Sequence, residues 1–227
     1  MDIDLVRYAV PYLLEGAWLT LLITLFGIVV GFPWAMLVAV ARISRPALLQ
    51  FCADGYCAVF RGTPMLVQIF VLYYGLAQIP FIRQNPLAWW LIGDSLHVAI
   101  LAVVLNTGAY TAEIFRTAFL SLPRGPIEAA QACGMTRWTI FRRVTFPLAL
   151  RQALPAYSSE VAIIVKETSL ASTITVLEIT GYAKRLMSET FAIMEIFILA
   201  SAIYLAINVV FLVAMKLLES RLSLHRR

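Results

Sequence analysis

The fold is decided by one polar loop, residues 121–147, which reads SLPRGPIEAAQACGMTRWTIFRRVTFP. Pro126 suits the first position of a helix, where its missing N–H costs no hydrogen bond, and Glu128 in the first turn favours the helix dipole. Gly134 is typical of a helix end, and Thr136 suits the start of a second helix. We therefore predict two short helices joined by a glycine, the first with a face of small side chains: Ala129, Ala130, Ala132 and Cys133.

The chain around this loop is strongly apolar. Its 227 residues are 61% hydrophobic and 14% charged, with a mean hydropathy of +0.84, whereas a soluble domain is nearer half apolar and a quarter charged. A bilayer core of about 30 Å needs roughly 20 apolar residues of helix, and several windows have this length. The sequence thus predicts an all-α integral membrane protein, a single domain over 1–227. Its five expected spans are approximately 17–41, 60–80, 95–120, 146–172 and 192–218, with a loop over 121–146.

The span 146–172 contains charged residues, so four spans and a soluble insert are the alternative. We count it as a span because Val161–Val165 and Leu170–Leu177 lack the polarity of a solvated helix. The run Lys166–Thr173 predicts a helix end or break within it, of the kind that exposes backbone groups to a cavity in transporters.

Lysine and arginine in the short loops predict the orientation, because they gather on the cytoplasmic side of a membrane. An external N-terminus places most of them there, so we predict N-out and C-in. The net charge of +5 then reflects orientation and not nucleic-acid binding, and the acidic Asp2 and Asp4 predict no cleaved signal peptide. The cytoplasmic set is Arg42, Arg45, Arg116, Arg124, Arg137, Arg142, Arg143, Arg151, Lys216, Arg221, Arg226 and Arg227; the external set is Arg7, Arg83, Lys184 and Arg185.

Small residues recur every four positions in the first span, at Gly27, Gly31, Ala35 and Ala39. Such a stripe lets another helix approach closely. The partner is either a helix of the same chain or one from a second subunit.

Residues 128–147 carry a motif with a known spacing: Glu128-Ala129-Ala130, three residues, Gly134, nine residues, Val144, one residue, then Phe146-Pro147. This resembles the EAA motif of ABC importer permeases, with Val144 and Phe146 in place of Ile and Leu. The segments RGTPMLVQIFVLYYGL (61–76), AYTAEIFR (109–116) and KETSLAST (166–173) are similar to permeases of the polar amino-acid family, of the histidine/glutamine type.

This resemblance implies a type I importer transmembrane domain in the inner membrane of a bacterium. Its partners are a cytoplasmic ABC ATPase dimer, a second permease, identical or related, an extracytoplasmic solute-binding protein and membrane lipid. The chain has no phosphate-binding G-x-x-x-x-G-K-[ST] loop, so ATP and Mg belong to the ATPase and the chain itself needs no cofactor. The residues that the resemblance assigns to ATPase coupling are Glu128, Ala129, Ala130, Gly134 and Pro147.

Polar groups at membrane depth are candidates for a solute pathway, since hydrocarbon cannot solvate them. On the third span Asn106, Tyr110 and Glu113 share one helix face. Glu160 is expected near mid-depth, either as counter-ion to a cationic group of the solute or paired with Arg151 or Lys166; Glu113 is expected to pair with Arg116. The full candidate set is Gln68, Asn106, Tyr110, Glu113, Glu160, Lys166 and Asn208.

The function predicted is therefore ATP-driven import of polar amino acids, with basic amino acids or opines favoured by the carboxylates Glu113 and Glu160. Two other classes compete. A secondary transporter or channel needs no ATPase but often has internal repeats, which this sequence lacks. An intramembrane enzyme would need a reactive set, but no His/Glu metal set or Ser/Lys pair stands out at reactive spacing; His97 is the one histidine on an apolar span, and His225 lies in the basic tail.

Overall fold

The computed structural model describes residues 3–222, and within them all regular structure is helical. Four residues named above lie outside the described residues: Asp2 of the signal-peptide prediction, His225, and Arg226 and Arg227 of the cytoplasmic set. The helices are α1 (Ile3–Val29), α2 (Gly31–Arg42), α3 (Ala47–Gly62), α4 (Met65–Phe70), α5 (Pro80–Gln84), α6 (Pro86–Ile92), α7 (Ser95–Leu120), α8 (Arg124–Ala132), α9 (Arg137–Ile140), α10 (Phe146–Glu167), α11 (Ile179–Thr190) and α12 (Ile193–Leu222). Shorter π or 3₁₀ turns lie at Val71–Gly75, Leu76–Gln78, Phe141–Thr145 and Thr168–Ile174.

Three helical stretches of the described chain are long and apolar enough to cross a membrane: Ile3–Arg42, α7 and α12. A fourth arises if α3 and the helical run Met65–Gln78, which are bent by 107°, count as one span. The helix α10 does not meet the criteria of length and composition that select these candidate spans. The expected span 60–80 is therefore not one straight helix.

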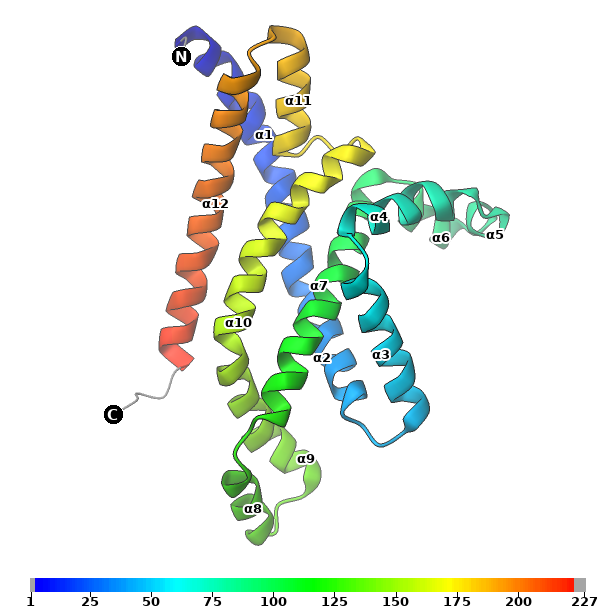
Figure 1. The fold of residues 1–227 in the computed structure, drawn as a ribbon, viewed down its shortest axis with the longest axis vertical. Helices are drawn as coiled ribbons and strands as arrows, with labels where there is room; N and C mark the ends of the chain where they lie inside the picture. The colour runs from blue at the N-terminus through cyan, green and yellow to red at the C-terminus, as the bar shows by residue number, and fades with distance from the viewer. Residues whose placement is uncertain (1–2, 223–227) are drawn as a thin grey trace.

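The bend follows from the Gly62-Thr63-Pro64 sequence. Proline disfavours the helical region for the residue before it, and Thr63 is extended, with φ −120° and ψ 145°. Pro64 is extended as well, so α3 ends and α4 starts in a new direction. Figure 1 shows α4, α5 and α6 extending sideways from the bundle. Arg61 consequently lies in the last turn of α3, whereas the expected bounds 60–80 put it at the start of a span.

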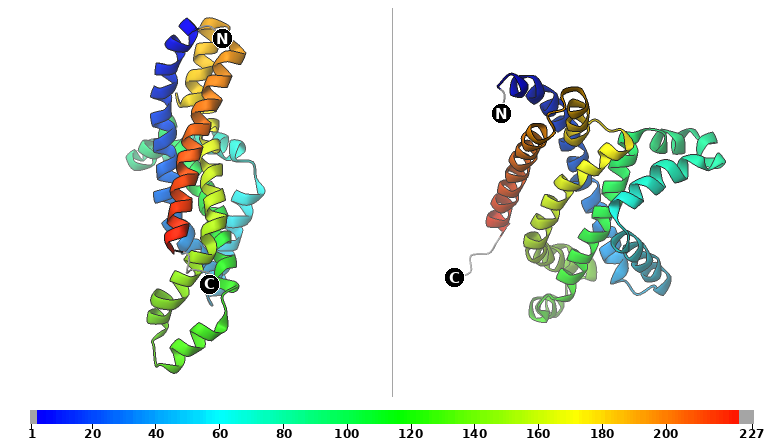
Figure 2. Two further views of the ribbon diagram at one scale, coloured as in Figure 1. Left: turned by 90° about the vertical axis from the view of Figure 1, so that its left-hand side faces the viewer. Right: turned by 45° about the horizontal axis from the view of Figure 1, so that its top comes forward.

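The centre of the bundle is α7. In the 18-residue apolar segment of α7, 67% is buried inside the protein, whereas in the corresponding segment of α12 only 11% is buried. Figures 1 and 2 show α7 enclosed by α1, α2, α3 and α10, while α12 lies along the edge. Most of the surface of α12 is thus exposed on the outside of the bundle.

The small-residue stripe packs within the chain. A Cβ on Gly27 would lie 2.7 Å from Val103 Cγ1, and one on Gly31 would lie 3.6 Å from Thr107 Cγ2. The stripe continues onto α2, where Ala35 is fully buried in the cluster against α7. Close approach of α1 and α2 to α7 therefore accounts for these small residues.

The loop 121–146 folds as two short helices, α8 and α9, at one end of the molecule (Figure 1). Two details differ from expectation: α8 begins at Arg124, so Pro126 occupies its third position and Glu128 lies beyond the first turn. Proline is still tolerated there, because the first N–H groups of a helix have no intrahelical partner. The predicted cap of α9 is confirmed, since Thr136 Oγ1 accepts a hydrogen bond from Thr139 N at 3.3 Å.

Candidate functional site

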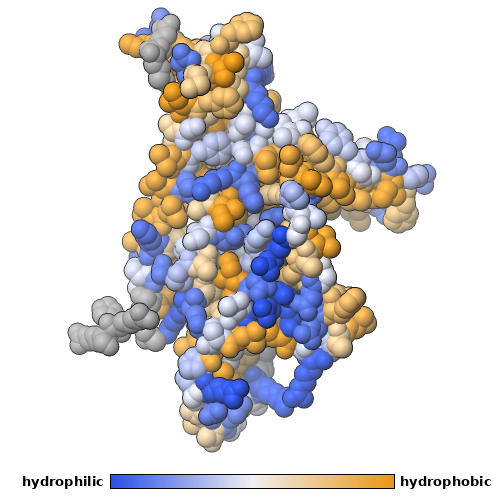
Figure 3. Space-filling model, in the orientation of Figure 1, coloured by the Kyte–Doolittle hydropathy of each residue, from blue (hydrophilic) through white to orange (hydrophobic). Residues whose placement is uncertain are grey.

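A pocket of about 390 Å³ opens between α7 and α10. Tyr110, Glu113 and Thr117 face it from successive turns of α7, and Gln152 and Glu160 face it from α10. In Figure 3 hydrophilic residues gather in the middle of this view, flanked by hydrophobic surface. Three of the predicted pathway residues, Tyr110, Glu113 and Glu160, therefore share one pocket.

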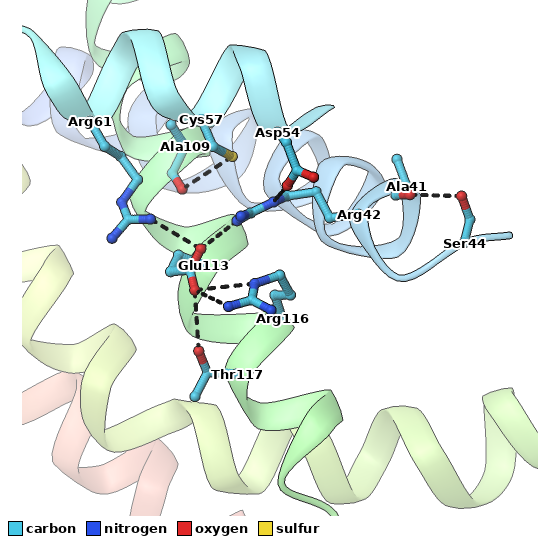
Figure 4. A network of polar contacts seen from close by, with 10 residues as sticks. All are labelled: Ala41, Arg42, Ser44, Asp54, Cys57, Arg61, Ala109, Glu113, Arg116 and Thr117. Carbon is cyan, nitrogen blue, oxygen red and sulfur yellow. Dashed lines mark hydrogen bonds and ion pairs between the residues drawn. The ribbon is translucent and has the colours of Figure 1, made fainter. Parts of the chain in front are cut away.

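Glu113 is the centre of an ion-pair network (Figure 4). Its Oε1 accepts from Arg116 Nη2 at 2.7 Å, the pair that the sequence predicts, and its Oε2 accepts from Arg61 Nη1 at 3.0 Å. Arg42 Nη1 also donates to Oε2, and Arg42 Nε donates to Asp54 at 2.6 Å. One carboxylate thus holds three guanidinium groups and ties α2 and α3 to α7.

Glu160 is 6% exposed and lines the pocket. Within residues 3–222 its carboxylate has no hydrogen bond or ion pair, so neither Arg151 nor Lys166 pairs with it. Glu167 lies two turns further along the same face of α10, and its Oε2 is buried with no hydrogen-bond partner among the described residues. Sequence reasoning did not select Glu167, although its spacing of seven from Glu160 places both on one face.

Gln68 and Asn106 stabilise the bend after α3. Asn106 Nδ2 donates to Gln68 Oε1 at 3.0 Å, and Gln68 Nε2 donates to the carbonyl oxygens of Phe60 at 2.8 Å and Thr63 at 3.0 Å. These contacts join the end of α3 and the start of α4 to α7. Neither amide lines the pocket between α7 and α10.

Lys166 and Asn208 lie elsewhere. Lys166 lines a second pocket of about 280 Å³, with Thr180 and Tyr204 among its neighbours. Asn208 is on α12, and its Oδ1 is buried without a hydrogen-bond partner in the described part of the chain. The seven candidates therefore do not form one layer around one cavity.

The predicted coupling residues lie on α8, just after it at Gly134, and at the start of α10. Glu128, Ala129 and Gly134 are exposed, whereas Ala130 is buried and Pro147 is half-buried near the start of α10. Because α8 and α9 protrude from the end of the molecule, this exposed face is accessible to another protein (Figure 1).

Residues 27–224 match the model of the family described as binding-protein-dependent transport system inner membrane component. The chain belongs to this family. As a permease it carries the transport function, and ATP hydrolysis lies in a separate subunit of the importer.

Among similar proteins, this permease is 49% identical to the octopine transport system permease protein OccM of Rhizobium meliloti over 215 residues, covering 95% of this chain and 87% of OccM. It is 44% identical to the nopaline transport system permease protein NocM of Agrobacterium fabrum, covering 100% and 94%. A crystal structure of an amino acid ABC transporter with histidines superposes with a TM-score of 0.84 at 29% identity, covering 97% of the permease and 99% of that chain. The fold is thus that of a type I ABC importer transmembrane domain.

Proposed function

We propose that this permease carries amino acids or opines that have a cationic group, across the inner membrane of a bacterium. The observation that carries the proposal is Glu160, a carboxylate in the pocket between α7 and α10 with no partner among the described residues. A buried charge without a partner is costly. A cationic group of the solute would supply the missing partner.

The relatives support this choice of solute. OccM and NocM are named for transport of octopine and nopaline, and a third relative, of Escherichia coli, is named an arginine ABC transporter permease at 34% identity. The other carboxylate of the lining, Glu113, is already held by three arginines. Glu160 is thus the carboxylate of the lining that remains available to a solute.

The proposed arrangement in the membrane has five spans, with the N-terminus outside and the C-terminus in the cytoplasm. Ile3–Arg42, α7 and α12 supply three spans, the bent pair that starts with α3 supplies the fourth, and α10 supplies the fifth. The α10 span packs against α7, α12 and α1, and its Glu160 is buried, so this carboxylate would be shielded from lipid.

The proposed partners are a second permease, a solute-binding protein on the outside and an ATPase dimer on the inside. Support for the ATPase surface comes from α8, which lies at one end of the molecule (Figure 1) and on which Glu128 and Ala129 are exposed. Small side chains on this face allow a close approach of another protein. Bound ATP and Mg would belong to that partner.

The test is transport by the assembled complex in proteoliposomes, with the binding protein outside and ATP inside. We expect Glu160→Gln to reduce uptake of arginine or octopine at least tenfold, because a charge-assisted hydrogen bond contributes about 1.5–3 kcal/mol. Glu219→Gln on α12 removes a carboxylate outside the pocket and serves as the matched control.

Wild-type uptake by Glu160→Gln would contradict the assigned role of Glu160. Uptake by the permease alone, without ATPase or ATP, would instead favour the alternative of a secondary transporter or channel. Omitting ATP from the same vesicles measures this second outcome directly.

A further inference from the structure

The pocket between α7 and α10 contains a cation as well as a carboxylate. Arg61 reaches it from the last turn of α3, and its guanidinium carbon lies 5.7 Å from the centre of the Tyr110 ring. The side chain of Arg61 is 38% exposed, against 31% for Arg116 and 12% for Arg42. Among the three arginines that hold Glu113, Arg61 is therefore the most open and the one that lines the pocket.

Arg61 has hydrogen-bonding capacity to spare. A guanidinium group carries five N–H donors, and within residues 3–222 Arg61 forms one side-chain hydrogen bond, from Nη1 to Glu113 Oε2. In Figure 4 its other terminal nitrogen points away from Glu113. Its Nε and Nη2 form the edge on which arginine takes a carboxylate with two parallel hydrogen bonds.

Charge in the network also favours an incoming anion. Arg42, Arg61 and Arg116 carry three positive charges, whereas Glu113 and Asp54 supply two negative ones. The remaining positive charge is best placed on Arg61, because Arg42 has a second carboxylate in Asp54 and Arg116 donates two hydrogen bonds to Glu113, whereas Arg61 donates one. A solute carboxylate at Arg61 would complete the balance without breaking the bond to Glu113.

We propose that Arg61 binds the carboxylate of the solute, while Glu160 on α10 takes its cationic group. Glu113 is then a positioning residue that holds the guanidinium of Arg61 at the pocket wall. The inference rests on the proposed function and defines its solute class: an amino-acid derivative with both a carboxylate and a separate cation. A polyamine, which has only the cation, satisfies Glu160 but not Arg61.

The experiment measures equilibrium binding of arginine, octopine and agmatine to the complete permease–ATPase complex in nanodiscs, without the binding protein. Agmatine is arginine without its carboxylate. We expect the wild type to bind arginine or octopine at least tenfold more tightly than agmatine, and Arg61→Gln to lose this preference while agmatine affinity stays the same. Arg61→Lys retains the charge but not the planar group that donates two parallel hydrogen bonds, so it should keep part of the preference for arginine over agmatine.

Arg116→Gln is the matched control, since it also removes a guanidinium from Glu113 but lies outside the pocket lining. It should keep the preference for a carboxylate. The inference is overturned if Arg61→Gln retains the preference, if Arg116→Gln loses it equally, or if the wild type has none. Glu160→Gln should weaken agmatine binding, so the proposed function can stand where the Arg61 inference fails; a complex that binds none of the three ligands contradicts both.

Discussion

Gly134 ends α8 by a backbone conformation that an L side chain resists. Its φ is +73°, in the left-handed region. Met135 N donates to Ala130 O at 3.2 Å and Gly134 N donates to Gln131 O at 2.9 Å, the two bonds of a Schellman motif. A Cβ on Gly134 would meet nothing within 4 Å. Substitution here is therefore opposed by backbone strain and not by crowding within the chain.

The magnitude follows from this conformation. An L residue other than glycine pays roughly 1–2 kcal/mol in the left-handed helical region, while asparagine is tolerated there more readily. We expect Gly134→Ala to weaken the helix end by that amount, a factor of about 5–30 in the equilibrium between closed and frayed forms. Gly134→Asn should have a smaller effect.

The assay is hydrogen–deuterium exchange of the permease, because the amide protons of Gly134 and Met135 are protected only while the motif is closed. Gly134→Ala should speed their exchange by about the same factor. The exchange rate should be lowest in the wild type, higher in Gly134→Asn and highest in Gly134→Ala. Equal exchange in wild type and Gly134→Ala would refute the reasoning. Coupling to the ATPase adds a second readout: Gly134→Trp should impair ATPase co-purification or uncouple ATP hydrolysis from uptake.

Three further outcomes are expected. Gly16→Ala should lower the midpoint of thermal unfolding of the purified permease, because its Cβ would lie 2.8 Å from the backbone at the start of α11. Gly55→Ala is the control, since its Cβ would meet open space, and it should raise or preserve the midpoint; equal shifts in the two variants would contradict this. A double-mutant cycle of Gln68→Leu and Asn106→Leu should show a coupling of about 0.6 kcal/mol, up to about 1.7, in denaturation of the reconstituted protein, and strict additivity would count against the bond. Glu178→Gln should lower the free energy of unfolding by about 1–3 kcal/mol in the same assay, since this fully buried carboxylate joins α1, α11 and α12. An unchanged free energy of unfolding would show that these hydrogen bonds do not stabilise the fold.

The sequence predicted those elements whose signals are local. The third span is expected over 95–120 from its apolar window, and the helix α7 covers Ser95–Leu120; Asp94, just before it, accepts hydrogen bonds from Leu96 N and His97 N and so caps its start. The expected break near Lys166–Thr173 is confirmed, since α10 ends at Glu167 and a 3₁₀ turn follows. Capping groups and helix breaks act within a few residues, so they can be recognised without the fold.

The pairing of charges could be predicted only in part. The bond between Glu113 and Arg116 follows from their spacing of three on one helix. Arg42 and Arg61 come from α2 and α3, and they reach Glu113 only because Gly62-Thr63-Pro64 ends α3 beside α7. The spacing of residues along the chain does not predict contacts of this kind between side chains from different helices. For this reason the place of Arg61 in the pocket could not be predicted from the sequence.

Depth in the membrane alone is consequently an incomplete guide to function. Gln68 and Asn106 are both buried and are hydrogen-bonded to each other, and this bond stabilises the bend, although Asn106 Oδ1 has no partner in the described part of the chain. Glu160 is equally enclosed but has no partner among the described residues, and Arg61 has donors left over. The free energy cost of an unsatisfied charge in a low-dielectric region is high. An unpartnered carboxylate beside a pocket is for this reason the group that we propose for binding the cation of a solute.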